Sequence, residues 1–192
     1  MISEHELQTA PAGGGENYLS RILDRMRRLC SRREYCSREI YGKAVSALKK
    51  GLPQASDADL DKMASGLLAS LVSDRYVDDR RYAAAFARDK SSLSGWGRMK
   101  ICKALSLKGI HEDIISDAVS TIDTSSASLR MEKVLEVKYR SLCKAGHRGD
   151  RSVQKSGTEA MEIKMKMLRY AAGRGYRYEE AAPVIERLIS GS

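Results

Sequence analysis

The chain has 192 residues, enough for one or two ordinary domains with buried cores, and its 42% of hydrophobic residues argues against a wholly disordered chain. Three prolines in a sequence rich in Leu, Ala, Met, Lys, Arg and Glu favour helices over strands. The 34 Lys and Arg residues against 25 Asp and Glu give a net charge of +9, which favours a polyanionic partner such as nucleic acid or an acidic protein surface.

The first part of the chain predicts a tail followed by three helices. Residues 1–16 contain a proline and a glycine triplet, which are typical of a flexible tail. Apolar residues recur at three- and four-residue spacing over 18–30, 36–48 and 57–71, which predicts three successive helices. We assign them to a first repeat, residues 17–73.

The same order of three helices recurs in residues 74–123 and again, more loosely, in residues 124–192. The third repeat contains a long predicted loop at 145–157, rich in glycine and charge. The sequence therefore predicts an all-α fold, an elongated array of three tandem three-helix, helix-turn-helix-like repeats.

Glycines mark the end of the second helix in each repeat. The three segments are Lys50-Gly51-Leu52, Lys108-Gly109-Ile110 and Arg174-Gly175-Tyr176. A helix commonly ends on a glycine in the left-handed conformation, with a cation near the negative end of the helix dipole. We therefore expect a left-handed glycine at each of the three positions.

The sequence contains no pattern that predicts catalysis, a cofactor or a metal. Gly95-Trp96-Gly97 lacks the remaining residues of a phosphate-binding loop, and His111-Glu112-Asp113 is typical of a helix start. The spacing of Cys30 and Cys36 matches no usual zinc site. We expect a cytoplasmic monomer with reduced thiols and no membrane segment, while pairing of these two cysteines stays open.

Positive charge is concentrated in residues 78–110, where eight cations and three carboxylates give a net charge of +5. This is more than half of the net charge of the chain, in about a sixth of its length. Such a surface would attract phosphates or acidic side chains with salt-sensitive affinity. We expect Tyr82 and Phe86 in the core. Trp96 could either anchor its turn to the core or present a flat face to a partner.

This segment, DDRRYAAAFARDKSSLSGWGRMKICKALSLKGI, resembles the central module of the RecX regulatory proteins, bacterial modulators of the RecA recombinase. The shared pattern is an acidic pair and an arginine before an aromatic-containing helix, a Gly-x-Gly turn, and a basic helix that closes on Lys-Gly-Ile. Arg98 takes the place of a proline that often follows the turn in the family. Weaker likeness extends from about Leu19 to Ile189.

The resemblance implies a non-enzymatic regulator that binds RecA filaments on DNA and inhibits RecA activities in recombination, DNA repair and SOS control. It also implies weak, salt-dependent contact with single- or double-stranded DNA. We predict that the contacts are made by Arg81, Arg88, Lys90, Trp96, Arg98, Lys100, Lys103 and Lys108. Reversal of Arg98 and Lys100 to Glu is expected to abolish inhibition while helicity is kept.

Two other functions are compatible with the same residues. The chain could act by itself on duplex DNA as a helix-turn-helix-like protein with the helix at 97–108 as reader, although that helix has no Asn or Gln to read bases. It could also be a helical scaffold for an acidic protein. Sequence-specific operator binding would favour the first, and activity without nucleic acid the second.

Overall fold

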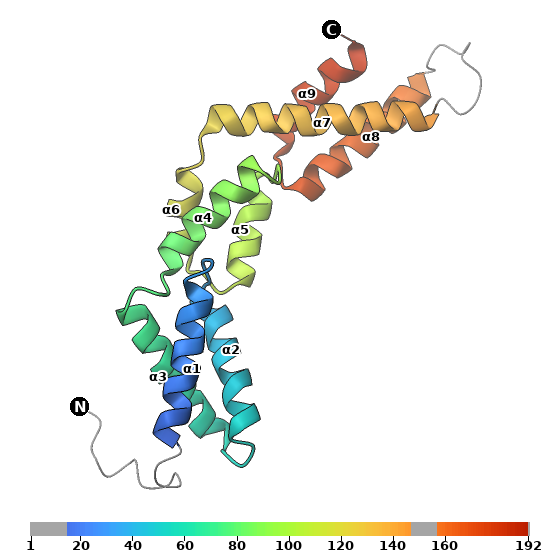
Figure 1. The fold of residues 1–192 in the computed structure, drawn as a ribbon. Coiled ribbons are helices and arrows are strands. Elements are labelled where there is room, and N and C mark those ends of the chain that lie inside the picture. Colours follow the sequence, from blue (N-terminus) through green and yellow to red (C-terminus); the bar gives the residue numbers. More distant parts are fainter. Residues whose placement is uncertain (1–14, 147–156, 192) are drawn as a thin grey trace. The chain divides into compact units, whose positions relative to one another are not determined.

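In the computed structural model, the described residues 15–146 and 157–191 form nine α-helices and no strand (Figure 1). The helices are α1 (Gly15–Cys30), α2 (Ser37–Gly51), α3 (Asp57–Ser73), α4 (Asp79–Ser92), α5 (Arg98–Leu107), α6 (Glu112–Ser120), α7 (Thr124–Gly146), α8 (Gly157–Arg174) and α9 (Tyr178–Ser190). They follow one another in three groups of three, which confirms the predicted all-α fold and its tandem three-helix order. Residues 1–14 of the predicted tail and 147–156 of the predicted loop lie outside the described residues.

The chain divides into two compact units, Met1–Tyr82 and Ala83–Ser192, with the division inside α4. The first unit contains α1, α2 and α3 together with the start of α4. The second unit contains the rest of α4 and the helices α5 to α9.

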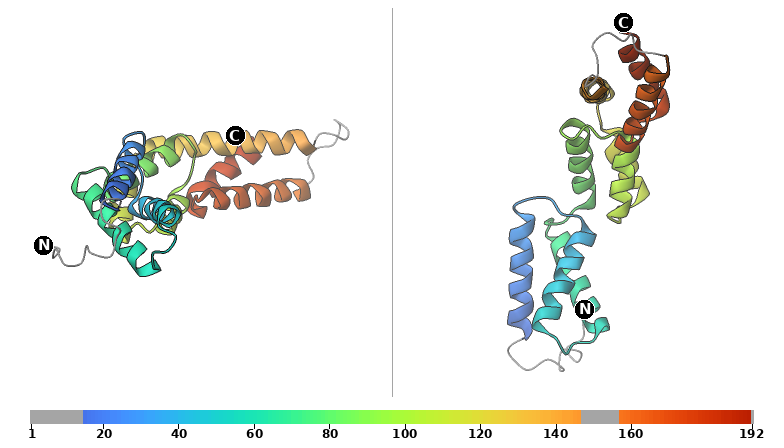
Figure 2. Two further views of the ribbon diagram at one scale, coloured as in Figure 1. Left: turned by 60° about the horizontal axis from the view of Figure 1, so that its bottom comes forward. Right: turned by 90° about the vertical axis from the view of Figure 1, so that its right-hand side faces the viewer.

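In the first unit, α1, α2 and α3 pack around one core (Figure 2). Ile22 and Met26 of α1, Ile40 and Leu48 of α2, and Leu71 of α3 are all buried. Each buried side chain of this size contributes about 1.5–3 kcal/mol relative to exposure. The helical spacing of these residues therefore decides which face of each helix turns inward.

Gly51 does not end α2 in the predicted way. It is the last residue of the helix and has no positive φ, and Leu52 follows it with φ −129°. The predicted left-handed conformation at Gly51 is therefore wrong. A Cβ here would lie 2.1 Å from the ring of Tyr18, whose hydroxyl donates to the carbonyl of Ala47 at 2.7 Å, so a larger residue would displace that ring.

The second unit contains the other two helix-terminal glycines, and both have the predicted conformation. Gly109 has φ +77° and Gly175 has φ +84°. After Gly109 the chain returns to the core through Ile110, which is buried. The buried side chains of α7, α8 and α9, which include Leu135, form a further core within this unit.

Candidate functional site: the turn before α5 and the outer face of α5

The Gly95–Gly97 turn, which connects α4 to α5, is hydrogen-bonded to the turn between α8 and α9. The amide of Gly97 donates to the carbonyl of Arg174 at 2.8 Å, and the amide of Met99 donates to the carbonyl of Gly175 at 3.2 Å. These are amides at the start of α5 and carbonyls at the end of α8, groups that have no partner within their own helices. The start of α5 is therefore fixed by the third group of helices.

Two side chains strengthen the same contact. The guanidinium of Arg174 donates to the carbonyl of Ser94 at 2.7 Å, and the hydroxyl of Tyr176 donates to the carbonyl of Gly95 at 2.7 Å. The hydroxyl of Tyr176 is half-buried, and burial raises its pKa above the ordinary value. It therefore stays protonated as a hydrogen-bond donor at neutral pH.

The two backbones approach so closely that glycine is required on both sides. A Cβ on Gly97 would lie 2.2 Å from the carbonyl oxygen of Gly175, and a Cβ on Gly175 would lie 2.4 Å from the amide nitrogen of Lys100. Gly95 has φ +60°, which also favours glycine. The sequence predicts Gly175 as a helix end, but it gives no sign that Gly97 contacts it.

Four of the predicted site residues meet around two aromatic rings, in a group that we name the Trp96 cluster: Phe86, Lys90, Trp96, Lys100 and Lys108. The rings of Phe86 and Trp96 pack edge to face, with centroids 6.2 Å apart. The ammonium groups of Lys90 and Lys100 lie 5.0 and 4.7 Å from the Trp96 centroid, and that of Lys108 lies 5.9 Å from the Phe86 centroid. Cation–π attraction of about 0.5–1 kcal/mol per exposed contact holds this positive charge in place.

The structure answers the two sequence expectations for the aromatic residues differently. Tyr82 is buried, as predicted, whereas Phe86 is half-buried and packs against Trp96. Trp96 is also half-buried. The ring of Trp96 contacts Phe86 and two lysines. Trp96 is therefore anchored within its own unit while part of its ring stays exposed.

The outer face of α5, which we name the α5 face, consists of Met99, Lys103 and Leu107, spaced four residues apart, with Arg98 at the helix start. Met99 is 55% exposed and Leu107 is 71% exposed. Arg98 and Lys103 are exposed as well, and no ion pair involves either of them among the described residues. Ile101, on the opposite side of the helix, is fully buried. The two exposed apolar side chains were not predicted as site residues, although their spacing with Lys103 is visible in the sequence.

Arg81 and Arg88 differ from the other predicted site residues. The Nε of Arg81 donates to the carboxylate of Glu34 at 2.6 Å within the first unit, and this hydrogen bond raises the pKa of the guanidinium. Arg88 is exposed, with its Nε 3.8 Å from the carboxylate of Asp89. Lys100 also has a structural contact, because its ammonium group donates to the carbonyl of Gly173 at 3.0 Å.

Among the described residues, no three metal-ligating side chains are grouped closely enough to hold an ion. His111 is the residue directly before α6, in agreement with the predicted helix start, but its side chain contacts Asp113 and does not cap the helix backbone. None of the four cysteines forms a disulfide, so Cys30 and Cys36 are not bonded to each other in this structure. No helix of the described part has both the length and the apolar character needed to span a membrane.

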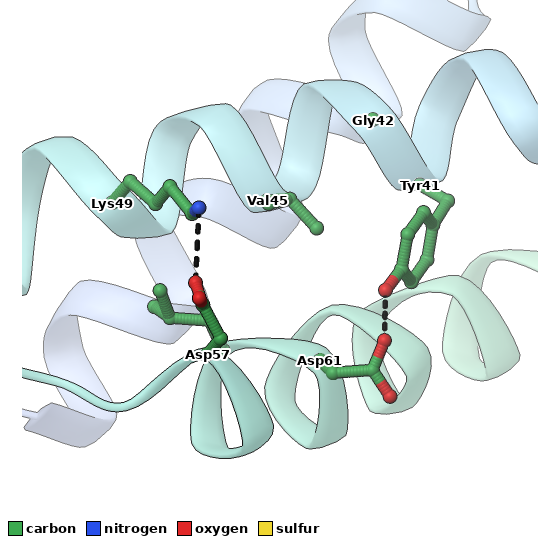
Figure 3. A pocket seen from close by; sticks show the side chains of 7 residues that line it. Tyr41, Gly42, Val45, Lys49, Asp57 and Asp61 are labelled. Atoms are coloured by element: carbon green, nitrogen blue, oxygen red, sulfur yellow. Dashed lines mark hydrogen bonds and ion pairs between the residues drawn. The ribbon is translucent and has the colours of Figure 1, made fainter.

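A hollow of about 320 Å³ lies between α2 and α3 in the first unit (Figure 3). Its polar side chains pair with one another across the hollow. The hydroxyl of Tyr41 donates to the carboxylate of Asp61, and the ammonium of Lys49 lies 3.0 Å from the carboxylate of Asp57. Because these groups satisfy each other, we assign no ligand to the hollow.

Comparison with protein families matches residues 78–119 to "RecX, second three-helix domain". The regulatory protein RecX of Clostridium perfringens strain SM101 is 30% identical over 114 residues, which are 59% of this chain and 48% of the relative. RecX of Mycobacterium sp. strain JLS is 22% identical over 157 residues, or 82% of this chain and 81% of the relative. The chain spans about half the length of the clostridial relatives that it matches.

Solved structures show the same fold. The crystal structure of RecX from Lactobacillus salivarius matches 90% of this chain and 97% of its own chain, with a TM-score of 0.61 and 16% sequence identity. The matched family domain contains α4, α5 and nearly all of α6, the segment in which the resemblance was found from sequence.

Proposed function

We propose that the chain is a RecX-type, non-enzymatic regulator that binds RecA filaments on DNA and inhibits RecA activities, because residues 78–119 match a RecX domain and the whole fold is similar to that of a RecX crystal structure. The processes affected are recombination, DNA repair and SOS control. The proposal gives the chain no reaction of its own and relies on binding alone.

The observation that carries this proposal is the mixed character of the α5 face. A surface that contacts only phosphates needs cations and hydrogen-bond donors. Here the exposed Met99 and Leu107 accompany Lys103 on one side of the helix. Exposed apolar side chains next to cations fit a protein surface that offers both apolar and acidic groups. A filament of protein on DNA provides such a surface.

The Trp96 cluster supports the second part of the proposal, a weak contact with the DNA in the filament. Lys90, Lys100 and Lys108 are close to aromatic rings that limit their movement. Each lysine that neutralises a phosphate adds salt-dependent affinity through counterion release. We propose that this DNA contact is secondary to the protein contact. The basic surface continues through Arg98 and Lys103 onto the α5 face, where the exposed apolar side chains favour a protein partner.

The alternative of a helix-turn-helix-like reader of duplex DNA is less well supported. Such a reader places the first turn of its recognition helix in the major groove. In this chain the amides of Gly97 and Met99, at the start of α5, already donate to the α8–α9 turn. The segment that would enter the groove is therefore in contact with another part of the chain.

The test is ATP hydrolysis by RecA on single-stranded DNA while this protein is titrated from well below equal stoichiometry up to it. We expect inhibition by the unaltered chain. The double reversal Arg98→Glu/Lys103→Glu should raise the half-inhibitory concentration about tenfold or more, which corresponds to about 1.4 kcal/mol or more of binding free energy. We choose Lys103 over Lys100 because Lys100 also contacts Gly173, so its reversal would disturb the turn itself.

The matched control is Lys133→Glu/Arg169→Glu, which makes the same change of charge at exposed positions of the same unit. It should inhibit like the unaltered chain. A second variant, Met99→Ala/Leu107→Ala, should weaken inhibition without lowering stability. Undiminished inhibition by both α5-face variants would contradict the proposed surface, and absence of inhibition at equal stoichiometry would contradict the function.

A further inference from the structure

Helix α1 in the first unit and the turn that follows it carry a line of exposed arginines. Arg21, Arg25, Arg28 and Arg32 are spaced by four, three and four residues, which places them on one side of a helix. All four are exposed. Arg32 lies in the tight turn that directly follows α1, where the amide of Ser31 donates to the carbonyl of Arg27 at 2.9 Å and the amide of Arg32 donates to the carbonyl of Leu29 at 3.1 Å. We name these four residues the arginine stripe.

The carboxylates near the arginine stripe are already engaged by other arginines. Residues 21–38 contain seven arginines, no lysine and two carboxylates, a net charge of +5. The carboxylate of Asp24 contacts Arg27 at 3.3 Å, and that of Glu34 contacts Arg81 at 2.6 Å. The positive charge of the stripe is therefore not neutralised by its neighbours.

The four arginines of the stripe contrast with Arg27 on the same helix. Arg27 reaches Asp74 at 2.8 Å and lies over the ring of Tyr76, so it contributes to the packing of the first unit. No ion pair of Arg21, Arg25 or Arg32 is found within the described part of the chain. The guanidinium of Arg28 makes one contact, to the backbone carbonyl of Asp24 at 3.3 Å. The stripe is thus available to a partner without loss of any internal ion pair.

We propose that the arginine stripe binds the sugar-phosphate backbone of duplex DNA without reading its sequence. From Arg21 to Arg32 the stripe is about 16 Å long at the helical rise of about 1.5 Å per residue. That length matches about five phosphates of one strand at about 3.4 Å each along the duplex axis. Arginine suits phosphate better than lysine does, because its planar guanidinium can donate two parallel hydrogen bonds.

Duplex DNA fits the stripe better than single-stranded DNA. Proteins that bind single strands combine basic grooves with aromatic side chains that stack on bases. None of the large hydrophobic or aromatic side chains described in α1 is exposed, since they turn toward the core around Met26. A straight row of guanidinium groups without a stacking surface matches the regularly spaced phosphates of a duplex better than the bases of a single strand.

The test measures binding of the full chain to a mixed-sequence duplex by fluorescence anisotropy over a series of salt concentrations, with no recombinase present. The variant is Arg21→Gln/Arg25→Gln/Arg28→Gln. Loss of three phosphate contacts should reduce the magnitude of the slope of log K against log salt by about 2.7, at about 0.9 per contact. Glutamine forms helices well and these side chains hold no tertiary contact, so circular dichroism should be unchanged.

The matched control removes three exposed cations from α2, α7 and α8, Lys50→Gln/Lys133→Gln/Arg169→Gln, with the same change of net charge. Its slope should equal that of the unaltered chain. Equal slope losses in both variants would show that net charge alone drives binding and would overturn the proposal. Loss of single-strand binding with duplex binding intact would overturn the choice of duplex DNA. Because the assay contains no recombinase and alters no residue of the α5 face, its failure would leave the proposed function standing.

Discussion

Replacing Gly97 with alanine should destabilise the second unit strongly, because Gly97 lies directly against the turn between α8 and α9. Gly97 has φ −76°, a value that any residue can adopt, so backbone strain is not the reason. The reason is space, because the new Cβ would lie 2.2 Å from the carbonyl oxygen of Gly175 and 2.4 Å from its carbonyl carbon. Both are backbone atoms in a turn and cannot rotate away as a side chain would.

The expected loss can be worked out from these contacts. Restoring an ordinary carbon–oxygen distance requires a separation of about 1 Å between the two turns, and overpacking of this kind costs about 1–3 kcal/mol. The same movement lengthens the hydrogen bonds from the amides of Gly97 and Met99, which stand at 2.8 and 3.2 Å. Each is worth about 0.5–1.5 kcal/mol. The free energy of unfolding should therefore fall by about 2–6 kcal/mol.

Trp96 makes the measurement direct, because it is the single tryptophan of the chain and precedes the altered residue. Urea denaturation followed by tryptophan emission reports on the second unit alone. Gly173→Ala is the matched control. It lies in α8 with nothing within 4 Å of the new Cβ, and it should stabilise the helix by about 0.5–1 kcal/mol. Equal urea midpoints for Gly97→Ala and the unaltered chain would refute the close contact between the two turns.

Three further changes test other parts of the structure. Gly51→Ala should cost the first unit about 1–3 kcal/mol in thermal unfolding followed by circular dichroism, because the new Cβ displaces the ring of Tyr18; in a Tyr18→Ala background it should cost almost nothing. Gly109→Ala should cost about 1–2 kcal/mol in urea denaturation, because φ is +77°, and no loss would contradict that conformation. The Cys30 thiol should react with iodoacetamide more slowly than a free cysteine at pH 8, because burial raises its pKa and lowers the thiolate fraction. Arg81→Gln should slow it further, because the Arg81 charge lowers that pKa; a faster reaction would contradict this.

The order of the helices could be predicted because it depends on local chemistry. Spacing of apolar residues determines which residues are helical, and Ser56 caps the start of α3, with its hydroxyl oxygen accepting from the amide of Asp59 at 3.1 Å. Gly109 and Gly175 were predictable for the same reason, since the conformation of a helix end depends on a few adjacent residues. The sequence pattern at Gly51 is the same, but there the side chain of a distant residue decides the outcome.

The arrangement of the candidate site could be predicted only in part. The concentration of charge in residues 78–110 predicted a basic surface, and four of its residues do meet in the Trp96 cluster. Their pairing with particular rings depends on the turn between α4 and α5, whose shape is set by contacts with residues about 80 positions away. Contacts at such separation leave no periodic signal. The arginine stripe, by contrast, has a regular local spacing that the sequence alone displays.

The two proposed surfaces differ in composition, and this difference gives them different responses to salt. The arginine stripe offers charge alone. Its affinity for duplex DNA should therefore fall steeply as added salt reduces the free energy gained from counterion release. The α5 face adds the exposed side chains of Met99 and Leu107, and burial of apolar surface is not screened by salt. As salt rises, binding to free duplex should therefore disappear before inhibition of RecA does. A salt series that follows both in parallel separates the contribution of each surface without a mutation.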